Sequence, residues 1–163
     1  MLKVSSRGHY GLRLMTELGR AHGQGPLPLS EVARVEVLPL PYLEQLVVPL
    51  RKAGLVEGTR GIHGGYQLTR PPGEIRVGDI LRALEGPVAL VDCTAHDYVH
   101  GTCMREADCL SSGLWHRLKV SVEAILDATS LYDLLFDPGF APGMPQFAVE
   151  HLEQLPMAQP VVG

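Results

Sequence analysis

The sequence predicts a mainly α-helical fold with a small β-hairpin wing, that is, a winged helix-turn-helix followed by a long dimerisation helix. Two short helical patterns follow one another over residues 30–52, with prolines between them. Two strand-like runs joined by a glycine-rich turn come next, over residues 55–69. A longer helical pattern with an apolar stripe begins near residue 112. Helix, turn, helix and hairpin in this order favour DNA binding, although protein-interaction modules use the same arrangement.

The first helix of the pair is expected to begin at Ser30, whose hydroxyl can accept first-turn amide hydrogens, and to end near Glu36. Pro41 suits the first position of the second helix, where a missing amide hydrogen costs nothing. Pro49 removes a backbone hydrogen bond, so we expect it to kink or shorten that helix. The second helix carries an apolar stripe at three- and four-residue spacing, formed by Leu43, Leu46, Val47 and Leu50.

A hairpin is expected after Gly54, which follows two basic residues and stops the second helix. The runs LVEG and YQLT can pair as antiparallel strands, and the glycines between them allow a tight turn. Arg60 and His63 lie in that turn, so we expect both side chains to point outward from the tip of the hairpin.

Helices are also expected on both sides of this unit. The first runs from a cap at Ser5 or Ser6 to about Ala21, and a short one follows the wing over residues 77–85. The long helix, capped by Ser111 or Ser112, has more apolar face than one protomer readily covers, which indicates self-association, with ordinary core packing as the equal alternative. The stripe of the first helix is Leu12, Met15 and Leu18, and that of the long helix is Leu114, Leu118, Val122, Ile125 and Leu126.

Four parts of the chain are expected from these patterns. They are the winged helix-turn-helix (1–86), a cysteine-containing loop (87–111), the dimerisation helix with a short return helix (112–136) and a tail with little fixed structure (137–163).

Charge is divided unevenly along the chain, whose formal net charge is −4. Residues 1–82 hold 11 of the 14 Lys and Arg against 7 of the 18 acids, a balance of +4, and residues 83–163 hold 3 against 11, a balance of −8. A positive half that faces phosphate and an acidic half that faces away suit a DNA-binding protein. Random scatter of solvated charges is the alternative.

Composition also bears on compartment and on activity. No apolar run approaches the roughly 18 residues needed to cross a bilayer, and the N-terminus lacks the apolar core of a signal peptide, so we expect a cytoplasmic protein with no membrane partner. An odd number of cysteines in a reducing compartment argues against a disulfide framework. The sequence shows no nucleophile–base pair, phosphate loop or acid pair, and we therefore do not expect an enzyme.

All three cysteines, Cys93, Cys103 and Cys109, lie within 17 residues, with His96 and His100 between the first two. This segment has no helical or strand period, so we expect a loop shaped by what the cysteines bind. Thiolates suit zinc, cuprous copper or iron–sulfur clusters. The spacing C-x2-H-x3-H-x2-C can also close a tetrahedral zinc site by itself, and thiols without a metal can sense oxidants.

Taken together, these motifs resemble the IscR, NsrR and CymR family of bacterial winged-helix regulators over about residues 1–136. The resemblance is carried by SSRGHYGLRLM, by PYLEQL with RKAGLV, by RGIHGGYQLTRPP and by DILRALEGPVALVDC. It implies a homodimer held by residues 112–128, with each winged helix on half of a pseudo-palindromic, double-stranded DNA operator. Pro39 and Pro41 depart from the family, because serine is often found at their positions.

The resemblance also implies which side chains face DNA. Tyr42, Glu44 and Gln45 match the family's major-groove positions, and Arg60 matches its minor-groove position, with His63 on the same hairpin tip. The chemistry agrees, because a glutamine amide pairs with a base edge, a glutamate accepts from cytosine and a guanidinium suits a narrow, negative minor groove.

The cofactor implied by the resemblance is an iron–sulfur cluster, of two or four irons, on Cys93, Cys103 and Cys109. The fourth ligand of the IscR branch is a histidine, and its position is Ser112 here. In the NsrR branch the fourth ligand is an acidic side chain on the first helix of the other protomer, and that position is His9 here. Three cysteines and His9 of the partner are therefore the expected ligand set. The remaining candidates for the fourth ligand are His96, His100 and His116.

The function implied is that of a transcriptional regulator, with repression as the expected action. Its operator affinity would be controlled by a cluster that senses redox state, nitric oxide or cluster supply. Two alternatives stay open: a regulator of the same fold that uses thiol redox sensing without a cluster, and a zinc-binding regulator.

Overall fold

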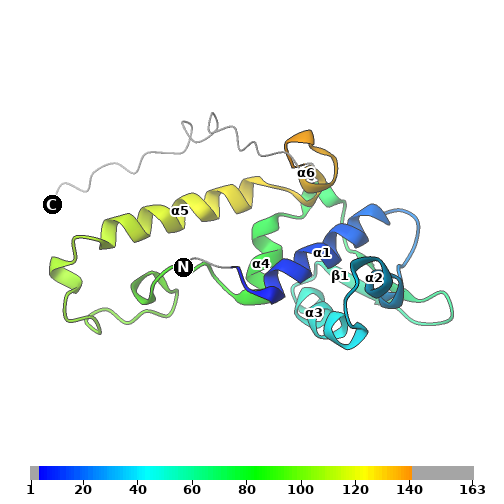
Figure 1. Cartoon of the computed structure of the whole chain (residues 1–163), viewed down its shortest axis with the longest axis horizontal. Helices are drawn as coiled ribbons and strands as arrows, with labels where there is room; N and C mark the ends of the chain where they lie inside the picture. Colours follow the sequence, from blue (N-terminus) through cyan, green and yellow to red (C-terminus); the bar gives the residue numbers. More distant parts are fainter. Residues whose placement is uncertain (1–3, 141–163) are drawn as a thin grey trace.

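The computed structural model describes residues 4–140 and confirms the mainly helical fold with one two-stranded antiparallel hairpin. Figure 1 shows helices α1 to α4 and α6 packed together, while α5 runs away from them with the cysteine-containing segment alongside. The elements in chain order are α1 (Ser6–Arg20), α2 (Leu29–Glu36), α3 (Leu40–Lys52), β1 (Val56–Thr59), β2 (Gly65–Leu68), α4 (Val77–Glu85), α5 (Ser112–Ala128) and α6 (Leu131–Phe136).

A single apolar core joins the packed helices to the hairpin. The predicted stripe of α3 is buried in full, and α1 is held by Leu14, Met15 and Leu18, while the predicted Leu12 is only half-buried. Each such side chain contributes about 1.5–3 kcal/mol when it is fully buried. The buried residues beyond α1 and α3 include Val32, Leu55, Val56, Leu68, Ile75, Ile80, Leu84 and Leu131.

Glycine allows α1 and α4 to pack closely. A Cβ atom at the buried Gly11 would collide with the side chain of Leu84, which is itself buried. At its N-terminus α1 begins as predicted, because the Ser5 hydroxyl accepts hydrogen bonds from the amides of Arg7 and Gly8. The beginning and the closest contact of α1 are therefore both set by small side chains.

Helix α2 begins differently from the prediction. Ser30 is not its cap: the helix starts at Leu29, and Ser30 is exposed in the first turn. The reason is a contact distant in sequence, since Leu27 and Tyr66 exchange backbone hydrogen bonds of 2.8 and 2.9 Å. This bridge to β2 holds the chain extended up to Pro28, and α2 starts directly after it.

Helix α3 runs to Lys52, so Pro49 does not shorten it, and a kink at Pro49 stays a prediction. The buried side chain of Leu50 and the 3.0 Å hydrogen bond from the Leu55 amide to the Leu50 carbonyl stabilise the last turn despite the bond that proline removes. Pro41 occupies the second position, because α3 begins at Leu40. The predicted stop is confirmed at Gly54, whose positive φ of 68° ends the helix.

The predicted hairpin is confirmed. In its register Val56 pairs with Leu68 and Thr59 pairs with Gly65, which leaves residues 60–64 as the connecting turn. Only Val56 and Leu68 are fully buried, so one end of the hairpin is anchored in the core and the other end projects.

Helix α5 has no fully buried residue in the single chain, and it packs against α4 through half-buried side chains. Its C-terminal end is tied to α4 by Arg82, whose guanidinium donates to Asp127 of α5 at 2.7 Å and to Asp79 at 2.9 Å. The predicted return helix is confirmed as α6, which Ser130 caps. Within residues 4–140, no helix has the length and apolarity needed to cross a membrane. The predicted tail begins with a short helical turn at Pro138–Phe140, and the rest of it lies outside the described residues.

Candidate nucleic-acid interface and cysteine segment

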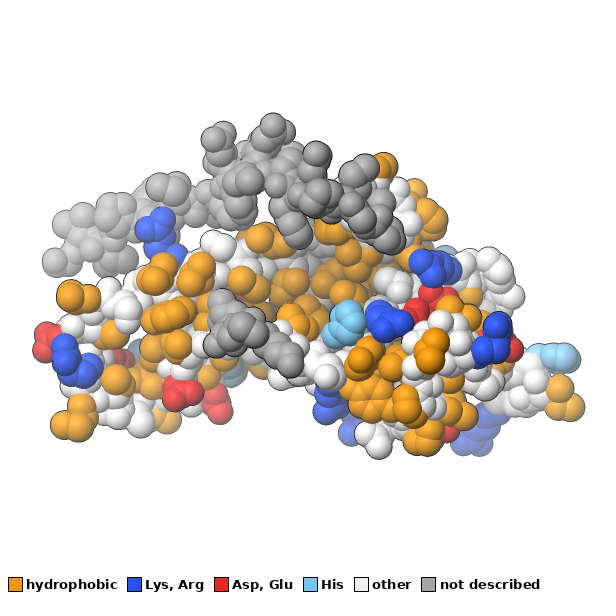
Figure 2. Space-filling view, viewed as in Figure 1, with side chains coloured by type: hydrophobic (Ala, Val, Ile, Leu, Met, Phe, Trp, Pro, Cys, Tyr) orange, Lys and Arg blue, Asp and Glu red, His pale blue; other side chains and the backbone are white. Residues whose placement is uncertain are grey.

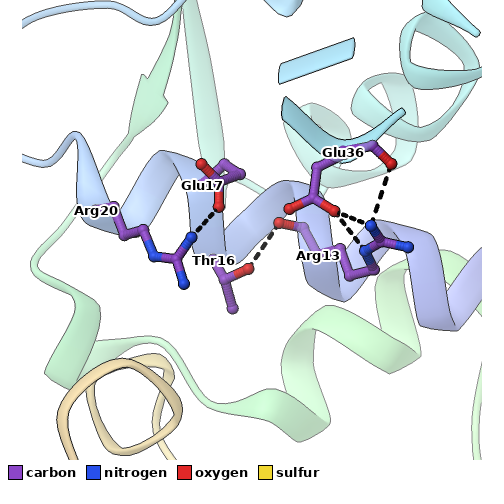
Figure 3. A network of polar contacts seen from close by, with 5 residues as sticks. All are labelled: Arg13, Thr16, Glu17, Arg20 and Glu36. Carbon is purple, nitrogen blue, oxygen red and sulfur yellow. Dashed lines mark hydrogen bonds and ion pairs between the residues drawn. The ribbon is translucent and has the colours of Figure 1, made fainter. Parts of the chain in front are cut away.

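Arg13 of α1 holds the C-terminal end of α2. Its guanidinium is paired with the carboxylate of Glu36 and also donates to the Glu36 carbonyl oxygen at 3.1 Å (Figure 3). That carbonyl is one of those for which a helix has no internal partner at its end, and the Glu36 side chain is only 10% exposed. Arg13 therefore caps α2 and fixes the start of the turn that leads into α3.

The turn itself is strained at Val37. Its backbone is left-handed, with φ 53° and ψ 47°, and its side chain is 87% exposed. A β-branched residue in this conformation costs about 1–2 kcal/mol. The amide of Leu38 donates to the carbonyl of Ala33 at 3.1 Å, and this bond together with Arg13 stabilises the turn.

Tyr42 links α3 to α1. The ring is half-buried and meets the ring of Tyr10 edge-on, with the centroids 5.9 Å apart, and Arg13 lies over Tyr10 at 5.6 Å. Glu44 and Gln45, in contrast, are exposed on the side of α3 that faces away from the core. The structure thus places two of the predicted major-groove residues on a free face and one partly within the packing.

The outward face of α3 also carries apolar side chains that the sequence analysis did not select. Figure 2 shows hydrophobic side chains gathered over α2 and α3, with Lys and Arg around them. Val48 of α3 is 51% exposed, between two polar positions of the outward face of this helix. Its place opposite the buried stripe is readable from helical spacing, but the sequence analysis considered only polar residues as candidates.

The turn of the hairpin carries the predicted wing residues. Arg60 and His63 are both exposed within the 60–64 turn, as expected, and Ile62 between them is almost completely exposed. The chain passes from α3 to β1 through Ala53, Gly54 and Leu55 alone, so the hairpin follows directly from α3.

The cysteine segment does not bring its thiols together. Cys93 lies in a short helical turn and Cys109 lies just before α5, both half-buried, while Cys103 is exposed in the loop between them. Within residues 4–140, no group of three or more Cys, His, Asp or Glu side chains is arranged to hold a metal. His9 is exposed on α1, where its ring lies tilted beside that of Tyr10 with centroids 5.1 Å apart.

A carboxylate, and not the thiols, organises this segment. Glu106 accepts a hydrogen bond from the amide of Gly101 at 2.6 Å and one from the Tyr98 hydroxyl at 3.1 Å, and His100 Nδ1 lies 2.5 Å from its other oxygen. The bond from Gly101, followed by the one from His100, lowers the pKa of Glu106. Since His100 faces Glu106, the predicted four-residue zinc arrangement is not formed here.

Two further contacts define the surroundings of the segment. The Cys109 Sγ lies 3.4 Å from the Ser111 hydroxyl, and this hydrogen bond lowers the pKa of the Cys109 thiol. A larger fraction of reactive thiolate follows from a lower pKa. Near Cys93, the Lys119 amine of α5 donates to the Thr94 carbonyl at 2.9 Å, which ties the segment to α5.

Comparison with known proteins agrees with this architecture. The profile of the Rrf2 family, described as iron-dependent transcriptional regulators, matches residues 4–137. The chain is 42% identical over 133 residues to the HTH-type transcriptional regulator CymR of Bacillus subtilis, which covers 82% of this chain and 89% of the relative. It is 36% identical over 138 residues to the HTH-type transcriptional regulator IscR of Aliivibrio salmonicida, covering 83% and 79%. The solved structure of CymR (YrzC), the global cysteine regulator of B. subtilis, superposes with a TM-score of 0.67 at 45% identity, over 83% of this chain and 97% of that chain.

Replacing Arg13 by alanine is expected to lower the free energy of unfolding by about 1–3 kcal/mol, because the Glu36 carboxylate and carbonyl both lose their partner. Arg34→Ala is the matched control, since Arg34 pairs with Glu31 and both side chains are exposed; its effect should stay within about 0.5 kcal/mol. Urea denaturation measures both. Equal losses for the two variants would show that Arg13 does not anchor the turn.

Proposed function

We propose that this chain, which belongs to the Rrf2 family of transcriptional regulators, binds operator DNA as a homodimer and that an iron–sulfur cluster on Cys93, Cys103 and Cys109 controls its affinity. The observation that carries the proposal is the position of the three thiols. All of them lie in one accessible segment between the end of α4 and the beginning of α5, so whatever they bind acts between the packed helices and the arm formed by α5.

The DNA-binding part of the proposal uses α3 and the hairpin. Gln45 and Glu44 are exposed on the outward face of α3, where an amide and a carboxylate can read base edges in the major groove, and Tyr42 borders them. Arg60 and His63 at the tip of the hairpin are placed to reach the neighbouring minor groove or its phosphates.

The homodimer is supported by the uncovered face of α5. The predicted stripe includes Leu114 and Ile125, which are exposed, while Val122 and Leu126 line an apolar groove of about 620 Å³ next to the end of α4. A second copy of the same helix covers such a face symmetrically, as homodimers usually do. Twofold symmetry then presents two copies of α3 to the two halves of a pseudo-palindromic operator.

The donor atoms fit the cluster, because three thiols suit iron and all three are accessible or half-buried. Their positions along the segment require a change of conformation before they can share one centre. The contacts that such a change would break are those of Glu106 with Tyr98, His100 and Gly101. When bound, the cluster would supply a group that reacts with oxidants and with nitric oxide.

His9 of the partner subunit is the proposed fourth ligand. Its position explains how α3 could respond to a change at the cluster. The tilted ring of His9 lies beside Tyr10, and Tyr10 meets Tyr42 of α3, so a displacement of His9 would act on α3 through these ring contacts. Two sites coupled in this way typically change each other's affinity by about 1–3 kcal/mol.

A second candidate is thiol sensing without a cluster. The lowered pKa of the Cys109 thiol, caused mainly by its hydrogen bond with Ser111, favours reaction with oxidants at this residue. A zinc-binding regulator is the remaining alternative, and metal analysis separates it from both.

Protein purified without oxygen is expected to contain iron and sulfide, and Cys103→Ala is expected to lose the visible absorption because one thiolate is removed. Val99→Ala, an exposed position of the same loop without a ligand atom, should keep the spectrum. Removal of the cluster should change operator affinity by about 5–150-fold. Metal-free protein would instead favour thiol sensing, zinc without iron would favour the zinc regulator, and unchanged affinity after cluster removal would disprove cluster control.

Leu114→Glu is expected to weaken the homodimer about tenfold or more, because a carboxylate would be buried against the second copy. The control is Val120→Glu, since Leu114 and Val120 are both 55% exposed but Val120 lies on the opposite side of α5. Sedimentation equilibrium gives both dissociation constants. If both variants dimerise like the wild type, the apolar stripe of α5 is not the interface.

A further inference from the structure

Val48 occupies the middle of the outward face of α3. Successive residues of an α-helix turn by about 100°, which places Val48 opposite the four buried residues of this helix. Valine is among the residue types most often buried, yet Val48 is 51% exposed. Pro41 lies two turns earlier on the same face and is exposed as well.

Other apolar side chains in and near α3 are exposed besides Val48. Val37 in the preceding turn and Leu40 at the start of α3 are also exposed. Figure 2 shows that hydrophobic side chains gather over α2 and α3 in a patch bordered by Lys and Arg. Single exposed apolar residues need no explanation, whereas a contiguous group of them marks a surface that makes a contact.

The neighbours of Val48 indicate which contact this is. Gln45 lies one turn before it and Lys52 one turn after it, both exposed on the same face, and the half of the chain that contains them carries a balance of +4. An amide that can read a base edge and a cation that can meet phosphate match the edge and backbone of a duplex. An apolar protein surface would leave both groups without partners.

We propose that Val48 reads thymine, by packing its methyl groups against the C5-methyl of a thymine in the major groove beside the base that Gln45 contacts. This inference rests on the proposed function, in which α3 enters that groove. Thymine is the only base of unmodified DNA that presents a methyl group there, and glutamine pairs with adenine, whose partner is thymine. Gln45 and Val48 therefore select A·T together, Gln45 through hydrogen bonds to adenine and Val48 through apolar contact with thymine.

The expected effect of one methyl contact is modest but measurable. Burial of one methyl-sized group contributes about 0.8 kcal/mol, which corresponds to about a fourfold change in affinity. A pseudo-palindromic operator bound by a homodimer contains the contact twice. The loss of both methyls should therefore lower the affinity by roughly fifteenfold.

The experiment uses the full-length protein and an operator obtained by selection from random duplexes. Each thymine of that operator is replaced in turn by deoxyuridine, which lacks only the C5-methyl group. Wild type and Val48→Ser are titrated with both kinds of duplex. Val120→Ser, a similarly exposed valine of α5, is the control for the substitution itself, and Arg60→Ala is the control for a contact outside the major groove.

The wild type and Val120→Ser are expected to lose about fourfold in affinity per symmetric half when deoxyuridine stands at the contacted position. Val48→Ser should bind the thymine and deoxyuridine operators equally, and Arg60→Ala should weaken both by the same factor while keeping the thymine preference. A wild type indifferent to deoxyuridine at every position, or a Val48→Ser variant that keeps the preference, overturns the inference while operator binding stands. Failure of the selection to enrich any sequence overturns the proposed function as well.

Discussion

The burial of one face of α1 is the constraint on which the arrangement of the other elements depends. This helix contacts α2, α3, α4, α6 and β2, so its orientation sets theirs. Close approach to α4 is possible because position 11 is glycine, and the end of α2 is held because position 13 is arginine. Tyr10 then contacts Tyr42, and the buried stripe of α3 sets the rotation of that helix about its axis. The outward face of α3, with Gln45 and Val48, is therefore a consequence of how α1 packs.

In the proposed dimer, with His9 of the partner subunit as the fourth ligand, the same helix would connect the cysteine segment to α3. His9 is exposed on α1 beside Tyr10. The cysteine segment is tied to α5 near Cys93, where the Lys119 amine donates to the Thr94 carbonyl. Helix α5 is in turn tied to α4 by Arg82. In a homodimer formed through α5, the segment of one protomer and α1 of the other would lie within one assembly, and a change of shape in the segment would displace a helix that is already coupled to the DNA-reading face.

Periodic features were predictable from the sequence, and features set by distant contacts were not. The stripe of α3, the stop at Gly54 and the hairpin follow from spacing and from glycine, and all are confirmed. The start of α2 was missed because it depends on a bridge between Leu27 and Tyr66, nearly 40 residues apart in sequence. The loop was expected to depend on its cysteines, whereas the Glu106 carboxylate with its three partners organises it. Such a network has no sequence periodicity from which it could be predicted. Val48 was missed for another reason, since only polar residues were considered as base readers. The roles of the predicted DNA-binding residues and of the cluster ligands, His9 included, stay predictions.

The central claim is that binding or loss of the cluster in the cysteine segment changes the local stability of α1 and α3. Hydrogen–deuterium exchange of the same dimeric protein, with and without its cluster, measures this most directly, because amide exchange reports local opening along the chain. The account predicts that removal of the cluster changes exchange not only in residues 87–111 but also in α1 and in α3. A change confined to the cysteine segment, with α1 and α3 exchanging identically in both forms, would contradict it.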